Sequence, residues 1–279
     1  MLSVARRIKG KLIKMLARFK KIVPVNIPVY HSDLLMGRVA VITGGTSGIG
    51  FEIACAFLRS GATVVITGRY ENRIEQSTKE LLMIDSKYEN RVFGSVLDVS
   101  NIKNLDSSLS GIIDMLGKKK IDILVNNAGI LKGDNFSNVS PKDYDEVLNT
   151  NLKGVFFLSQ YVSKYMVEND IKGNILNIGS SSKWGVRGLT LGMAKALAPH
   201  GIVVNGLAPG PTATPMLMKG DCDGIEHYKI PSQRYSTSVE IANFSVILVS
   251  SLSRSIIGDI IYMTGGAGNL TIDDIEYNF

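Results

Sequence analysis

Cysteine and histidine are scarce in this chain. Its 279 residues include two cysteines, Cys55 and Cys222, and three scattered histidines, His31, His200 and His227. Two cysteines cannot build a disulfide framework, and there is no CxxC motif or His/Cys cluster, so the sequence predicts no metal site. A reducing, cytoplasmic compartment is the expectation for such a chain.

Long apolar runs are also missing from residues 1–32. They hold no stretch near the ~20 apolar residues that a membrane-spanning helix needs, and no uninterrupted apolar core of a secretory signal. Hydrophobic residues make up 45% of the chain and charged residues 20%. This balance excludes wholesale disorder and suffices for one large core.

Acidic residues are absent from residues 1–32, which carry eight basic side chains. The rest of the chain therefore holds 23 of the 31 basic residues against all 25 acidic ones, and is nearly neutral. Because the basic character belongs to this arm alone, the sequence does not predict nucleic-acid binding by the whole protein.

The arm has the pattern of a basic amphipathic helix. Ile8, Leu12, Met15, Phe19 and Ile22 recur at steps of three and four, which places them on one helical face. Such a helix suits an anionic membrane surface, here through residues 1–23, which would make the protein peripheral at the inner face of the membrane. Packing on the protein's own body or on another subunit is the alternative, and a transit peptide is a third reading. The sequence thus predicts an arm and linker over 1–32 and a nucleotide-binding domain over 33–279.

A strand, a glycine-rich turn and a helix follow one another near the start of that domain. Arg38–Ile42 is a short apolar run typical of a buried strand, Thr43–Gly50 is rich in glycine, and Phe51–Ser60 favours a helix that ends at Gly61. A second strand is expected over 62–67. Backbone N–H groups and the helix dipole at such a turn bind phosphates, which predicts a dinucleotide site.

The end of the second strand indicates the type of cofactor. An acidic residue there would bind the ribose 2′-hydroxyl of NAD, but the sequence reads Thr67-Gly68-Arg69. The planar fork of Arg69 suits a 2′-phosphate. A solvated loop arginine is the alternative, and NADP(H) is favoured over NAD(H).

The spacing Thr43-Gly44-(three residues)-Gly48-Ile49-Gly50 resembles the fingerprint of the short-chain dehydrogenase/reductase family, including its 3-oxoacyl-carrier-protein reductases. Further matches follow in the family's order over nearly all of residues 37–268. They are Leu97-Asp98-Val99, Asn126-Asn127-Ala128-Gly129, Asn151, Ser180, Pro209-Gly210 with Thr214, Ile257-Gly258-Asp259 and Thr264-Gly265-Gly266.

This resemblance implies an α/β fold: a Rossmann-like, doubly wound, mostly parallel sheet with helices on both faces. It also implies a homodimer or homotetramer. The residues that it implies for cofactor binding are Gly44, Thr46, Ser47, Gly48, Ile49, Gly50, Arg69, Asp98, Val99, Asn127, Ala128, Gly129, Lys183, Pro209, Gly210 and Thr214.

The family's chemistry is hydride transfer between the nicotinamide and a carbonyl or alcohol substrate. The resemblance assigns the catalytic roles to Ser180, Lys183 and Asn151. A tyrosine four residues before the lysine would carry the proton, and the nearby ammonium would lower its pKa. Gly179 stands at that position here, and Ser180 and Lys183 are only three residues apart, as if the loop with the tyrosine were deleted. Tyr161 and Tyr165 are better explained as packing or interface residues.

Three functions therefore remain open, the third being a membrane-surface or partner-binding module in which the arm is the functional part. One is an NADP(H)-dependent oxidoreductase that reduces a carbonyl or oxidises an alcohol. The alternative is a catalytically impaired NADP(H)-binding homologue, tethered to a membrane by its arm. The sequence does not choose the substrate, which the resemblance assigns to residues 211–238.

Overall fold

The computed structural model describes residues 33–132, 138–179, 184–215 and 230–266. The helices are α2 (Gly48–Arg59), α3 (Glu71–Ile84), α4 (Leu105–Leu116), α5 (Pro141–Leu148), α6 (Gly154–Glu168), α7 (Trp184–Leu197) and α9 (Ser238–Val249). Short helical turns are η1 (Ser86–Tyr88), η2 (Ile102–Asn104), η4 (Asn149–Lys153), η5 (Ala198–His200) and η7 (Ser251–Ser253). The strands are β1 (Val39–Thr43), β2 (Thr63–Gly68), β3 (Val92–Val96), β4 (Ile123–Asn126), β5 (Asn174–Ile178), β6 (Val203–Pro209), β7 (Thr212–Ala213), β8 (Ser236–Thr237) and β9 (Ile260–Met263).

Seven of the strands in this part of the chain form one sheet, in the order β3-β2-β1-β4-β5-β6-β9. Every neighbouring pair in it is parallel. The chain leaves β1 for β2 and β3 on one side, then returns to β4 beside β1 and continues outward on the other side. This is the doubly wound arrangement that the sequence predicted, and its order reverses between β1 and β4.

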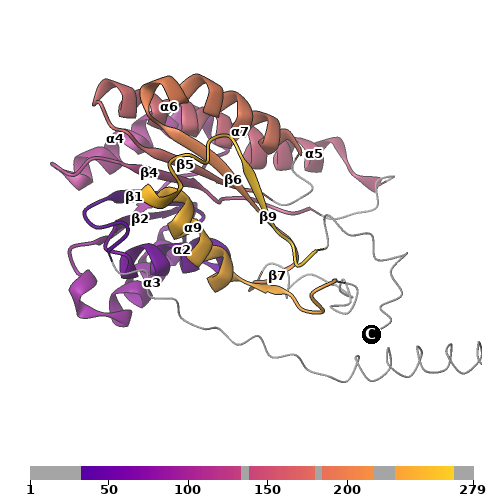
Figure 1. The fold of residues 1–279 in the computed structure, drawn as a ribbon, viewed down its shortest axis with the longest axis horizontal. Helices are drawn as coiled ribbons and strands as arrows, with labels where there is room; N and C mark the ends of the chain where they lie inside the picture. Colours follow the sequence, from indigo (N-terminus) through magenta and orange to yellow (C-terminus); the bar gives the residue numbers. More distant parts are fainter. Residues whose placement is uncertain (1–32, 133–137, 180–183, 216–229, 267–279) are drawn as a thin grey trace, which may run out of the picture.

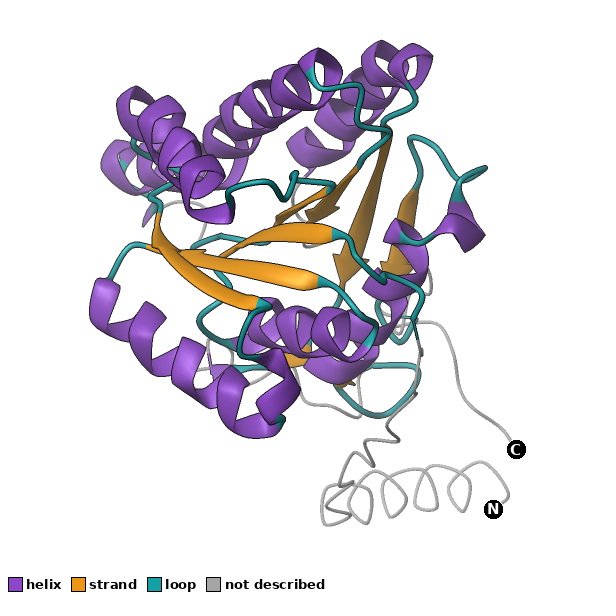
Figure 2. Cartoon of the chain, turned by 90° about the vertical axis from the view of Figure 1, so that its left-hand side faces the viewer, coloured by secondary structure: helices purple, strands orange, loops and turns teal. Residues whose placement is uncertain are grey.

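Helices cover both faces of the sheet (Figures 1 and 2). α2, α3 and α9 lie against one face, and α4, α6 and α7 against the other. Successive residues of a strand point to opposite faces, so Ala40 and Ile42 enter the first layer while Val39 and Val41 enter the second. Both faces are buried, which explains why β1 is apolar from Val39 to Ile42.

Two local features, the start of α2 and the helix type at Asn151, differ from the sequence-based expectation. The predicted helix over 51–60 begins three residues earlier, at Gly48, so the second half of the glycine motif forms its first turn. Asn151, expected in an ordinary helix, lies in η4, a π-helical turn between α5 and α6.

A chain of buried polar side chains links β4 and β5 to the helices α6 and α7. Asn126 at the end of β4 donates to Ser159 of α6 (2.9 Å) and to Asn177 of β5 (2.8 Å). Asn177 in turn donates to Thr190 of α7 (2.9 Å), whose hydroxyl donates to the Val186 carbonyl. Since all these polar atoms are satisfied, the chain fixes α6 and α7 against the strands.

Arg38, just before β1, joins four elements at the amino end of the sheet. Its guanidinium donates to the Val249 carbonyl of α9, to the Asp122 carbonyl (3.1 Å) and to Asn174 Oδ1 of β5 (2.9 Å). Asp122 Oδ2 accepts from the Val39 amide (2.9 Å). Burial lowers the pKa of Arg38, and the Asp122 carboxylate opposes that effect.

Tyr161 and Tyr165 of α6 pack against the second core layer, as expected from the sequence. Within the described ranges, no helix is long and apolar enough to cross a membrane. Residues 1–32 lie outside them, so the predicted arm and its boundary at residue 32 stay predictions.

Candidate cofactor and active site

The carboxyl ends of β1, β2, β4, β5 and β6 meet at one edge of the sheet. In parallel α/β sheets, the ligand-binding crevice forms at the point where the strand order reverses. The loops that follow the two strands beside this point lead in opposite directions and leave a gap between them. Here the loops after β1 and β4 border that point. Most of the predicted site residues lie in these loops or at the ends of the neighbouring strands.

The glycine-rich turn after β1 is closely packed. Gly44 has a φ of +62°, and a Cβ on it would lie 2.9 Å from the Ala128 Cα. A Cβ on Gly50 would overlap the Gly44 carbonyl oxygen and Asn127 Nδ2. Gly44 needs glycine because the backbones of the two loops touch there, and Gly50 because it packs directly against the Gly44 carbonyl and the Asn127 side chain.

Hydrogen bonds join the same two loops. Thr43 Oγ1 accepts from the amides of Asn127 and Ala128, both at 3.0 Å, and donates to the Val125 carbonyl. Asn127 Nδ2 donates back to the carbonyls of Thr43 and Gly44, at 3.0 and 3.1 Å. Asn127 therefore holds the two loops together, and its cofactor contact stays a prediction. Thr43 belongs to the glycine-rich family fingerprint, but the sequence did not indicate that its hydroxyl bridges the loops after β1 and β4.

The start of α2 has the features of a phosphate site. Ser47, its N-cap residue, is exposed, and its side chain makes no cap hydrogen bond. The first N–H groups of α2 thus have no side-chain cap from Ser47, and the helix dipole adds partial positive charge there. Thr214 lies beside this turn, since its Cβ is 3.6 Å from the position of a Cβ on Gly48. The uncapped start of α2 and the glycine-rich turn before it fit the phosphate of a dinucleotide.

The end of β2 carries Arg69, which is exposed, and no acidic residue. It adjoins the glycine-rich turn: the Gly45 amide donates to the Thr67 carbonyl at 3.1 Å. A Cβ on Gly68 would lie 3.3 Å from Thr46 Cγ2. The structure thus brings Thr46 and Arg69 to the same edge.

Asp98 and Val99 follow β3 at that edge. Asp98 Oδ1 accepts from the Ser100 amide (3.0 Å) and hydroxyl (2.7 Å), so this carboxylate shapes its own turn. Val99 is buried, and its carbonyl lies so close to Gly154 at the start of α6 that a Cβ there would be 2.5 Å from it. This contact seats α6 next to the site.

Asn151 holds the loop after β4 in place. Its Oδ1 accepts from the Ile130 amide (2.9 Å), and its Nδ2 donates to the Ile130 carbonyl (2.8 Å). The residue is buried, at 7% exposure. The paired bonds fix the segment that begins with Gly129, and Ile130 is a partner that the sequence did not indicate.

Pro209 and Gly210 end β6 beside the exit of β9. The Gly210 amide donates to the Met263 carbonyl at 3.0 Å, and a Cβ on Gly210 would lie 2.7 Å from the Thr264 Cα. Ser180 and Lys183 lie outside the described residues. Their roles therefore stay predictions, as do the cofactor contacts of all the residues named above.

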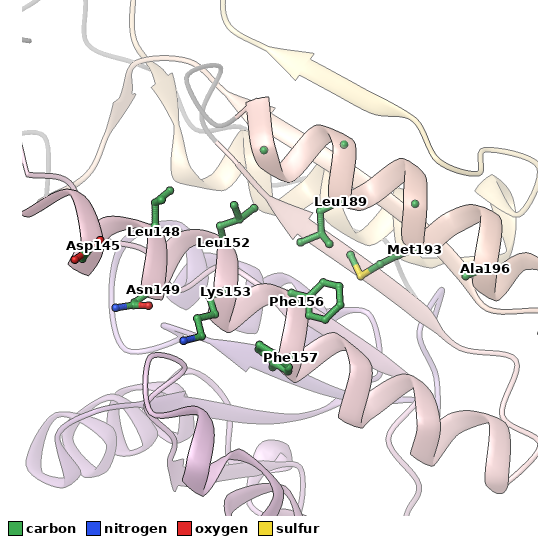
Figure 3. A pocket seen from close by; sticks show the side chains of 13 residues that line it. Asp145, Leu148, Asn149, Leu152, Lys153, Phe156, Phe157, Leu189, Met193 and Ala196 are labelled. Carbon is green, nitrogen blue, oxygen red and sulfur yellow. The ribbon is translucent and has the colours of Figure 1, made fainter. Parts of the chain in front are cut away.

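A groove of about 880 Å³ lies apart from the glycine-rich turn, between α5–η4–α6 and α7 (Figure 3). Leu152 and Phe156 line one side of it, and Leu189 and Met193 line the other. Gly188 and Gly192 of α7 also face it. Its lining is mostly apolar, with Asp145, Asn149 and Lys153 at one end.

The family model described as short chain dehydrogenase matches residues 38–223. The chain belongs to the short-chain dehydrogenase/reductase family. A 3-oxoacyl-[acyl-carrier-protein] reductase from Aquifex aeolicus is 33% identical over 247 residues, 83% of this chain and 98% of that protein.

Solved structures agree with this assignment. A short chain dehydrogenase from Burkholderia cenocepacia, in complex with NADP, has a TM-score of 0.74 at 28% identity and covers 84% of this chain and 98% of its own. A 3-ketoacyl-(acyl-carrier-protein) reductase from Brucella melitensis, complexed with NADH, has a TM-score of 0.76 at 28% identity, with 84% and 99% covered. The family and the fold class predicted from the sequence are thus confirmed.

Proposed function

We propose that this protein is an NADP(H)-dependent oxidoreductase that reduces a carbonyl or oxidises an alcohol. The observation that carries the proposal is the turn at Gly44–Gly50, with its close backbone packing and the start of α2 beside Arg69. The NADP in the Burkholderia cenocepacia relative supports the choice of nucleotide, while the NADH in the Brucella melitensis relative keeps NAD(H) as the second choice. The bound nicotinamide would supply or accept the hydride.

The roles proposed for the chain's own residues follow from this assignment. Gly44, Ser47, Ile49 and Gly50 would approach the phosphates through their backbone, because glycine and an uncapped helix start leave N–H groups accessible. Asn151 would keep the loop after β4 beside the nicotinamide. Ser180 would orient the substrate oxygen, and the ammonium of Lys183 would hold the nicotinamide ribose.

A specific observation favours a second candidate function, NADP(H) binding without turnover. Gly179 stands four residues before Lys183, where the family has the proton-carrying tyrosine. Without a phenol there, the proton for the substrate oxygen must come from another acid. The two candidates share the cofactor site and differ only in turnover.

NADPH consumption by the full chain with a panel of ketones and aldehydes separates these candidates. The reductase proposal expects turnover that Lys183→Ala abolishes while NADPH binding weakens, since that lysine is assigned both roles. NADPH binding with no turnover on the whole panel would favour the second candidate. Intact mass of the gene-encoded protein belongs to the same experiment, because a mass above that of the 279 residues would mean that the tyrosine segment exists.

We further infer that a second copy of the chain covers the α6–α7 groove. A Cβ on Gly188 or Gly192 would meet nothing within 4 Å, so neither glycine is needed for packing within the chain. Glycine inside a helix costs about 1 kcal/mol relative to alanine, so two such positions suit a partner backbone that approaches closely. Leu148 and Phe156 add exposed apolar surface at 37% and 42% exposure.

Light scattering on the intact protein tests this inference. The wild type is expected as a dimer or tetramer, and Gly192→Arg is expected to weaken association at least ~10-fold, because it buries an unpaired charge. Gly111→Arg on α4 is the control, since that glycine also has open space around it and lies outside the groove. A monomeric wild type, or equal association of both variants, would contradict the inference.

Residues 1–23 lie outside the described ranges, so their binding to an anionic membrane stays a prediction. Co-sedimentation of the full chain with anionic vesicles, compared with a chain starting at Asp33, would measure it.

A further inference from the structure

An ion pair joins the segment before α9 to the first turn of that helix. The guanidinium of Arg234 donates to both carboxylate oxygens of Glu240, at 2.8 Å from Nη1 and 2.6 Å from Nη2. Nη1 also donates to the Tyr235 carbonyl at 3.1 Å. The side chains of Arg234 and Glu240 are 40% and 38% exposed, so the protein covers more than half of each. Two parallel bonds and partial burial distinguish this pair from an ordinary surface ion pair, which fixes little.

Glu240 also caps α9. Its Oε2 accepts from the Thr237 amide at 2.8 Å, and the Glu240 amide donates to Thr237 Oγ1 at 3.2 Å. These two reciprocal bonds form a capping box. One carboxylate therefore binds Arg234 and Thr237 at the same time, and it fixes β8, which ends at Thr237, to the start of the helix.

β8 extends this constraint to the loop after β6. β7 and β8 are parallel neighbours, with Ala213 opposite Thr237. The Ser236 amide donates to the Pro211 carbonyl at 3.0 Å. Thr214 follows β7 directly. The place at which β8 is held therefore determines where Thr214 lies.

Thr214 lies against the glycine-rich turn. Its Cβ is 3.6 Å from the position of a Cβ on Gly48, the first residue of α2. α2 and α9 lie side by side (Figure 1), and Ile53 of α2 and Ile241 of α9 belong to the same core layer. The two helices therefore form a common base. α2 begins at the turn, and α9 holds β8, and with it β7 and Thr214, through its ion pair.

A second anchor holds the segment before α9 independently of the ion pair. Ile230 is buried, at 1% exposure, and the Ser232 amide donates to the Gly265 carbonyl at 2.9 Å. We therefore expect the segment to stay folded when the ion pair is removed. Variants of Arg234 and Glu240 then test the position of the segment and not its folding.

We propose that Arg234 and Glu240 are positioning residues for the nicotinamide half of the cofactor. This inference rests on the proposed NADP(H) function and deepens it. The ends of β1, β2 and β3 lie on one side of the crevice and those of β4, β5 and β6 on the other, so a dinucleotide places one half on each side. Arg69 follows β2 on the adenosine side, whereas Thr214 lies beyond β6 on the nicotinamide side. The ion pair therefore acts on the nicotinamide half, through Thr214.

Calorimetric titration of the full chain with NADPH and with adenosine 2′,5′-bisphosphate tests this inference without any turnover. The bisphosphate resembles the adenosine half of NADPH and lacks the nicotinamide. Glu240→Gln removes the charge but keeps an oxygen that accepts in a capping box, so it breaks the ion pair alone. It should weaken NADPH binding by ~5-fold or more and bisphosphate binding by less than ~2-fold, because only the nicotinamide side is displaced. Arg234→Met should do the same, and Arg234→Lys should recover part of the NADPH affinity, since it keeps the charge but loses the fork.

Asp170→Asn is the matched control, because it breaks the exposed Lys172–Asp170 pair (2.6 Å) just before β5, at the opposite edge of the sheet. It should leave both affinities unchanged. If the variants of Arg234 and Glu240 weaken both ligands equally, or neither, the inference is wrong while the proposed function stands. If the wild type binds NADH and not NADPH, the choice of NADP(H) fails, and the same comparison with NADH and adenosine 5′-phosphate decides the inference. A wild type that binds neither dinucleotide overturns both.

Discussion

Replacing Gly50 with alanine is expected to lower the affinity for NADPH by ~100-fold or more. The added Cβ would overlap the Gly44 carbonyl oxygen and Asn127 Nδ2, so the start of α2 must move away from both Gly44 and the Asn127 side chain. A displacement of about 1 Å at a binding site can cost that much, because every backbone contact in the site depends on the same geometry. Fluorescence titration of the purified variant with NADPH measures the change.

Alanine at Gly111 provides the control for this prediction. Gly111 lies inside α4, where a Cβ would meet nothing within 4 Å. Gly111→Ala should therefore leave NADPH affinity unchanged and stabilise the fold by up to ~1 kcal/mol. Thermal melts of both variants separate a lost site from a lost fold, and Gly50→Ala protein that is folded and binds NADPH within ~3-fold of wild type would refute the steric argument.

Asn127→Ala adds a second test of the same contact. The Cβ on Gly50 meets one side-chain atom, Asn127 Nδ2, and one backbone atom, the Gly44 oxygen. Removing the amide relieves only the first overlap and also deletes the bonds to the Thr43 and Gly44 carbonyls. The double variant should therefore bind NADPH no better than Gly50→Ala.

The sequence predicted the sheet well because both faces of its strands are buried. A strand covered on both sides is apolar at most positions, and such short runs between turn residues are easy to recognise. The strand expected over 38–42 is found at Val39–Thr43, shifted by one residue. The glycine-rich turn was also predictable, since its function demands glycine at fixed spacing.

Contacts between distant parts of the chain were not predictable. Asn177 and Thr190 are ordinary polar residues in the sequence, and only the fold shows them linking β5 to α7. The pairing of Asn151 with Ile130 spans 21 positions and leaves no periodic signal.

Arg38 is another residue whose role depends on packing. Arg38→Met should lower the free energy of unfolding by about 2–4 kcal/mol, measured by urea denaturation followed by circular dichroism. The substitution leaves the carbonyls of Val249 and Asp122 and the Asn174 side chain without their donor in a partly buried place. Unsatisfied buried polar groups cost about 1–3 kcal/mol each, and methionine keeps most of the apolar volume, so the loss reports hydrogen bonding more than packing.

Arg254 offers a matched control because it also donates to two backbone carbonyls, those of Lys172 (3.3 Å) and Gly201 (3.0 Å). It is exposed, so water replaces the lost bonds in Arg254→Met and the expected loss stays below ~1 kcal/mol. Equal losses for the two variants would mean that the burial of these hydrogen bonds does not set their contribution to stability. The expected difference would instead show that Arg38 stabilises the fold because its bonds to α9, β5 and the Asp122 carbonyl are partly shielded from water.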